Sequence, residues 1–96
     1  MDKIDQFIQI WLDFSLKLHE RQGIDEVLFA EMIQLLQDID VEYRAKDHIP
    51  KKLAEIFVDM FIAIDGSTPY YDDEYQQEIY QMADQLSYYA RNICTG

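Results

Sequence analysis

Hydrophobic residues recur three and four positions apart along almost the whole chain, which is the spacing of amphipathic helices. The first such stripe covers Ile4–Leu18, and Gly23 is expected to end this helix because glycine adopts a left-handed cap without penalty. Pro50 stands where a third helix would begin, a position at which the missing N–H costs nothing. The turn-forming run Asp65–Pro69 is expected to separate the last two helices. The pattern predicts helices over about residues 3–21, 25–44, 50–64 and 73–93.

Short connections between helices place consecutive helices antiparallel, so the predicted fold class is all-α: a compact four-helix bundle with mostly antiparallel neighbours. One domain is expected to cover residues 1–96. With three Gly and two Pro, the chain has too few turn residues for an all-β fold, which must turn about every 8–12 residues. Asp25 is expected to cap the second helix. The predicted buried face of the third helix comprises Leu53, Ile56, Phe57, Met60, Phe61 and Ile64.

The composition favours a folded protein of the cytoplasm. An apolar content of 49% and an aromatic content of 14% argue against disorder, despite a net charge of −11. The longest apolar run, Met60–Ile64, which includes Phe61–Ile64, is far shorter than the roughly 20 residues that span a bilayer. The first residues carry acids inside their apolar stretch and do not resemble a signal peptide. The one cysteine, Cys94, cannot form an internal disulfide, so we expect a soluble cytoplasmic protein without membrane contact.

Residues suited to catalysis or to metal binding are sparse. His19 is expected to lie at a helix end and His48 in a connection, and no nucleophile–base motif is present. The stretch Asp38–Glu42 resembles the start of a calcium loop, but Tyr43 and Ile49 occupy the places that need Gly and Glu. We therefore expect no enzyme activity, no metal site and no cofactor.

Charge is distributed unevenly along the chain. Between Lys52 and Arg91, 38 residues carry eight acids and no Lys or Arg. Ordinary surfaces mix both signs, because unpaired like charges repel one another. The usual preference for acids at a helix start explains the run Asp72–Glu74. It does not explain the other five acids: Glu55, Asp59, Asp65, Glu78 and Asp84.

An acidic surface that binds a basic protein would explain the whole set. The pair Tyr70–Tyr71 directly precedes Asp72–Glu74, and tyrosine is frequent at protein interfaces because it offers rigid contact area with a polar tip. Aromatic rings next to carboxylates suit a surface rich in Arg and Lys. Direct binding of nucleic acid is not expected, since a chain with a charge of −11 repels phosphates.

A small, acidic, helical chain without catalytic motifs resembles the bacterial immunity proteins, in particular the helical nuclease inhibitors of the colicin D and contact-dependent growth inhibition type. The resemblance covers roughly residues 25–93 and rests on the stretches Phe29–Ile39, Ile49–Phe61 and Asp65–Glu74. It implies that the partner is a basic nuclease toxin, an RNase in the first instance, whose substrate cleft is covered in a 1:1 complex. The residues that would face the toxin are Asp65, Tyr70, Tyr71, Asp72, Asp73, Glu74 and Glu78.

Other functions remain open. A helical regulatory module could pair with a second copy through its aromatic residues, which would give a stable dimer and salt-independent binding. A nucleic-acid mimic could use the same acids against a DNA-binding protein. An enzyme or ligand-binding bundle that works through carboxylates is the third alternative, and no nucleophile–base pair supports it.

Overall fold

The computed structural model describes residues 2–95 and contains only helices and connections in that range. The all-α prediction is therefore confirmed. Its elements are α1 (Lys3–His19), α2 (Glu26–Tyr43), α3 (Lys51–Ser67), the short 3₁₀ helix η1 (Thr68–Tyr70) and α4 (Asp73–Thr95).

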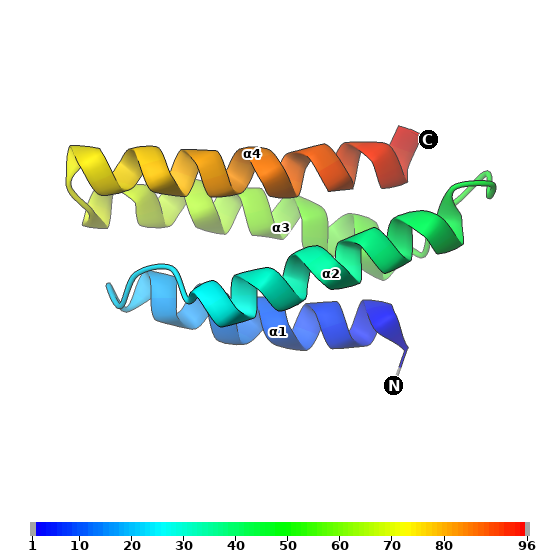
Figure 1. Cartoon of the computed structure of the whole chain (residues 1–96), viewed down its shortest axis with the longest axis horizontal. Coiled ribbons are helices and arrows are strands. Elements are labelled where there is room, and N and C mark those ends of the chain that lie inside the picture. The colour runs from blue at the N-terminus through cyan, green and yellow to red at the C-terminus, as the bar shows by residue number, and fades with distance from the viewer. Residues whose placement is uncertain (1, 96) are drawn as a thin grey trace.

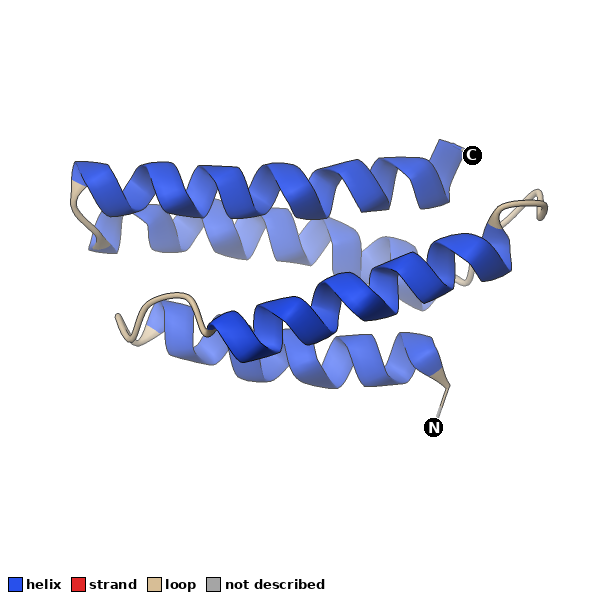
Figure 2. Cartoon of the chain, viewed as in Figure 1, coloured by secondary structure: helices blue, strands red, loops and turns tan. Residues whose placement is uncertain are grey.

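Consecutive helices run antiparallel, as predicted, but the bundle is not a simple sequential ring (Figure 1). The closely packed pairs are α1 with α2, α2 with α4, α1 with α3, and α3 with α4. Two of these pairs, α1 with α3 and α2 with α4, run parallel (Figure 1). The connection from α2 to α3 therefore crosses between diagonal corners of the bundle. The α1–α2 and α3–α4 connections lie at one end, and both chain ends lie at the other (Figure 2).

One hydrophobic cluster fills the space between the helices, and each helix contributes one stripe to it. From α1 the stripe includes Phe7, Trp11 and Phe14, and the ring of Phe7 meets Phe57 edge to face with centroids 6.2 Å apart. Such edge-to-face contacts add to the free energy gained by burying the rings. On α3 the cluster buries Leu53, Phe57, Met60 and Ile64, whereas Ile56 and Phe61 pack only partly against it.

The end of α1 differs from the prediction. The helix stops at His19, and the left-handed cap is Arg21 (φ 66°) rather than Gly23, so the predicted role of Gly23 was wrong. The N–H of Gln22 donates to the carbonyl of Lys17 at 2.9 Å, which closes the helix with the usual hydrogen bond across a left-handed residue. Gly23 also has a positive φ of 86°, but it lies in the connection beyond the cap.

The end of α3 was also predicted wrongly. The helix passes through Asp65–Ser67 and leads into η1 instead of stopping at Ile64. Ser67 and Thr68 are buried, and the Thr68 hydroxyl donates to the Ile64 carbonyl at 2.9 Å. A glycine inside a helix costs only about 1 kcal/mol relative to alanine, which cannot stop a helix whose next turn is buried. The α-helix instead ends just before Pro69, which lacks the N–H that would continue it.

Truncation of the two phenylalanines of α3 should distinguish the core from its margin. Phe57 is 5% exposed, and we expect Phe57→Ala to lower the free energy of unfolding by about 3–5 kcal/mol. Phe61 only borders the core, and we expect Phe61→Ala to cost about half as much, because less apolar surface returns to water. Urea unfolding of both variants checks this order, and equal losses would contradict it.

Substitution of the two described internal glycines should have opposite effects. A Cβ on Gly23 would lie 2.7 Å from the Tyr75 hydroxyl oxygen, on a backbone that already has a positive φ. We expect Gly23→Ala to destabilise the fold by about 1–3 kcal/mol. Gly66→Ala is the matched control, because nothing lies within 4 Å of that Cβ, and it should stabilise by up to about 1 kcal/mol. Thermal unfolding that shows the same sign for both would refute this account.

Candidate partner-binding surface

Most of the predicted binding residues lie at the end of the bundle where the α1–α2 and α3–α4 connections meet (Figure 2). We call this the loop end and define it as residues 19–26 and 65–74. It carries seven acidic side chains and one basic side chain, which gives a formal charge of −6. The exposed acids there are Glu20, Glu26, Asp65, Asp72, Asp73 and Glu74.

Glu20 and Glu26 were missed by the sequence analysis. Glu20 belongs to the first segment of the chain, where acids and bases are almost balanced, so charge counting along the sequence gave it no weight. Only the antiparallel turn between α1 and α2 brings it to the same end as η1 (Figure 1). The loop end therefore draws its charge from two distant parts of the sequence.

Two tyrosines join the connections of the loop end. The Tyr71 hydroxyl donates to the Leu18 carbonyl at 2.6 Å and accepts from the Gly23 N–H at 3.1 Å. The Tyr75 hydroxyl accepts from the Ile24 N–H at 2.6 Å. The two rings stack with centroids 4.9 Å apart. Backbone groups of the α1–α2 connection thus obtain their hydrogen bonds from the start of α4, which fixes the two connections against each other.

Tyr70 is the more exposed member of the predicted tyrosine pair. Its side chain is 40% exposed, and the guanidinium of Arg21 lies 5.0 Å from its ring centroid. The ring of His19 meets it edge-on at 5.4 Å. Arg21 therefore stands over an aromatic ring at a distance typical of a cation–π contact. Tyr70 still presents a face to solvent, whereas Tyr71 is half-buried, and their contact with a partner stays a prediction.

The acids at the start of α4 are fixed by the helix itself. A carboxylate oxygen of Asp72 accepts from the Tyr75 N–H at 2.9 Å, which makes Asp72 the N-cap, as the sequence allowed. Asp73 and Glu74 occupy the first turn, where the positive end of the helix dipole stabilises them. Within residues 2–95, none of the eight acids of the base-free stretch takes part in an ion pair. Their charges are therefore uncompensated.

Glu78 lies on the flank of the bundle rather than on the loop end. It lines a groove of about 170 Å³ between α2 and α4, together with Glu26 and Phe29. Glu26 belongs to the loop end as well, so it links this groove to the main group of acids. The structure thus brings Asp65 and residues 70–74 together at the loop end and places Glu78 beside them.

The ion pair between Lys17 and Asp25 holds the α1–α2 connection. Lys17 Nζ lies 2.6 Å from a carboxylate oxygen of Asp25, and another oxygen of Asp25 accepts from the Leu28 N–H at 3.0 Å, which confirms Asp25 as the predicted cap. These bonds, that of Lys17 first, lower the pKa of Asp25. Because the folded pKa is below the unfolded one, this stabilisation is present at neutral pH and is lost as the pH falls through the lowered pKa, below about 4.

Other kinds of site find little support in the described range. Among residues 2–95, no three His, Cys, Asp or Glu side chains gather so that they could hold a metal ion. Partial burial raises the pKa of the Cys94 thiol, which disfavours the reactive thiolate. No helix in this range is long and apolar enough to cross a membrane.

Comparison with known proteins adds no relatives: no family model, no curated protein and no solved structure matches the chain. The fold and the charge pattern alone define the class, an acidic all-α four-helix protein with an uncompensated negative end.

Removal of the Tyr71 hydroxyl should weaken the fold. We expect Tyr71→Phe to lower the free energy of unfolding by about 1–2 kcal/mol, because the Leu18 carbonyl keeps only the longer bond from the Arg21 N–H and the Gly23 N–H loses its acceptor. Tyr70→Phe is the matched control, since within residues 2–95 the Tyr70 hydroxyl forms no hydrogen bond, and its change should stay below about 0.5 kcal/mol. Equal effects in chemical denaturation would show that the tyrosine hydroxyls do not hold the loop end together.

Proposed function

We propose that this protein is a non-catalytic inhibitor that binds a basic nuclease toxin and covers its substrate cleft with the loop end. The observation that carries the proposal is the group of exposed carboxylates at one end of the bundle, which no base of the described chain neutralises in an ion pair. Repulsion among these carboxylates lowers the stability of the free protein. Binding of a basic partner would remove that repulsion.

The loop end is suited to such a partner by its rigidity. Asp72 is held by the helix that it caps, and Tyr71 and Tyr75 hold the neighbouring connection in place. Carboxylates that are already fixed lose little conformational freedom on binding, so more of the interaction free energy contributes to affinity. A nuclease cleft that attracts phosphates would attract these carboxylates by the same field.

A DNA-binding protein is the second candidate partner, because its basic surface would meet the same acids. The two candidates differ in what inhibition requires. A nuclease inhibitor should stop cleavage by a basic RNase or DNase domain, whereas a DNA mimic should compete with duplex binding by a protein without nuclease activity. Cleavage assays with basic RNase and DNase domains, and duplex-competition assays with DNA-binding proteins, therefore decide which kind of partner this chain inhibits.

Neutralising the acids at the start of α4 should slow association with that partner. We expect the combined variant Asp72→Asn, Asp73→Asn and Glu74→Gln to lower the association rate constant by about tenfold or more, because long-range attraction steers the encounter. Asn caps a helix as well as Asp, so circular dichroism should show unchanged helix content. The rate for the unaltered protein should also fall steeply as salt rises from about 50 to 500 mM.

The matched control removes the same number of charges elsewhere. Glu31→Gln, Glu42→Gln and Asp47→Asn are exposed positions on α2 and in the α2–α3 connection, and within residues 2–95 none of them forms an ion pair. This variant should lose much less of its association rate. If stopped-flow measurements show the same loss for both variants, only the total charge matters and the loop end is not the interface.

A further inference from the structure

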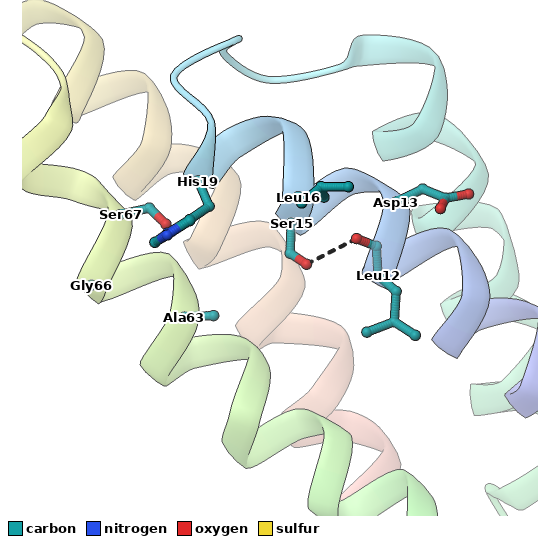
Figure 3. Close-up of a pocket in the computed structure, with 8 residues that line it drawn as sticks. All are labelled: Leu12, Asp13, Ser15, Leu16, His19, Ala63, Gly66 and Ser67. Carbon is teal, nitrogen blue, oxygen red and sulfur yellow. Dashed lines mark hydrogen bonds between the residues drawn. The ribbon is translucent and has the colours of Figure 1, made fainter.

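A second surface lies along the seam between α1 and α3, and it adjoins the loop end, with which it shares His19, Gly66 and Ser67. A hollow of about 630 Å³ is lined by Leu12, Leu16 and His19 of α1 and by Ala63, Gly66 and Ser67 of α3 (Figure 3). A smaller one of about 210 Å³ follows along the same seam, between Ile8 on α1 and Ile56 on α3. The two hollows follow one another along the seam of these parallel helices, and we call them together the α1–α3 groove. It extends over α1 from Ile8 to His19, about 17 Å at 1.5 Å per residue.

The groove exposes apolar surface that a free protein would normally cover. Leu12 is 50% exposed and Leu16 is 57% exposed, and both line the first hollow together with the exposed Ala63 of α3. A surface helix usually presents polar residues to water, whereas α1 presents two leucines next to an alanine of α3. Contiguous apolar surface of this kind marks interaction sites.

Gly66 leaves space beside the backbone of α3, and it lowers the stability of the free protein. It lies inside α3, where a glycine is less stable than an alanine, and a Cβ at this position would meet nothing within 4 Å. Packing inside the described chain therefore does not require the small residue. An occupant that approaches the backbone of α3 would require it.

The acidic side chains around the groove favour a basic occupant. Asp13 lines the first hollow, and Glu55 and Asp59 line the second. Lys52 is the only Lys or Arg that lines either hollow, and its ammonium is already held by Asp5 at 2.9 Å and Asp2 at 3.4 Å. A second copy of this chain would place a protein with a charge of −11 against this acidic margin. Charge complementarity favours a basic segment instead.

We propose that the α1–α3 groove binds an amphipathic helix of a partner protein, about three turns long, with an apolar face flanked by Lys or Arg. The apolar face contacts Leu12, Leu16 and Ala63, and it approaches α3 closely at Gly66. The flanking bases pair with Asp13, Glu55 and Asp59. The apolar contacts at Leu12, Leu16 and Ala63 lie outside the loop end, so binding in the groove can be tested separately from binding at residues 70–74.

The test uses a synthetic 14-residue helical peptide with Leu on one face and Lys on the others, titrated into the isotope-labelled full chain. Amide shifts should concentrate in residues 8–19 and 55–67. A second peptide with every Lys replaced by Glu should bind about tenfold more weakly or worse. Shifts confined to residues 70–74, or equal affinity of the two peptides, would overturn the proposal.

Two variants and a control locate the site. Leu16→Ser removes an exposed apolar contact, and Gly66→Gln fills the space beside α3. Each variant should therefore bind the Lys peptide about tenfold more weakly. Val41→Ser is the matched control, because Val41 is 67% exposed on α2 outside the groove, and it should change the affinity less than twofold. Equal losses of peptide affinity in all three variants would refute specific binding in the groove. A dimer of the free chain in sedimentation that Leu16→Ser abolishes would also overturn it, because a second copy would then be the occupant.

Discussion

The hydroxyl groups of Tyr71 and Tyr75 hold the two connections at the loop end together, so the acids of the α1–α2 connection keep their place beside those of α4. The hydroxyl groups satisfy the Leu18 carbonyl and two N–H groups of the α1–α2 connection. Without these bonds, the connection would expose its own polar groups to water and could move away from η1. The close approach of Tyr75 to Gly23 leaves no room for a side chain at that position. One packing arrangement thus fixes both the glycine and the spacing of the carboxylates.

Three of the eight Lys and Arg residues form ion pairs that join one helix to another or to its cap, and none of the three pairs with an acid of the base-free stretch. Lys3 joins α1 to Asp38 of α2, and Lys17 joins α1 to Asp25 before α2. Lys52 joins α3 to the start of α1 through Asp2 and Asp5. Exposed pairs of this kind contribute little stability each, about 1 kcal/mol or less. The hydrophobic core supplies most of the stability, and the remaining negative charge stays available at the surface.

The helical spacing of apolar residues was sufficient to predict the fold class, the approximate helices and most of the core of α3, because these depend on local periodicity. The cap at Arg21 was not predicted, because a left-handed conformation is expected at glycine, whereas here local hydrogen bonds to Lys17 and Leu18 close the helix around Arg21. The continuation of α3 through Gly66 depends on burial of Ser67 and Thr68, which turn propensities do not include. Of the site, charge counting identified the acids of one connection. Those of the other connection were missed because charge counting along the sequence does not use the antiparallel turn that brings Glu20 to the same end as η1.

The two proposed surfaces meet near the end of α1, where His19 lines the groove and also contacts Tyr70 of the loop end. They differ in the distance over which they would attract a partner. Carboxylates on the loop end act at long range, so they govern how often a basic partner arrives. The apolar groove acts only on contact, so it governs how long a bound segment stays. A protein with only the first surface would bind any basic partner weakly and would lose it as salt rises. The groove would accept only a segment whose apolar face fits it. It would therefore distinguish one basic partner from another, which charge alone does not do.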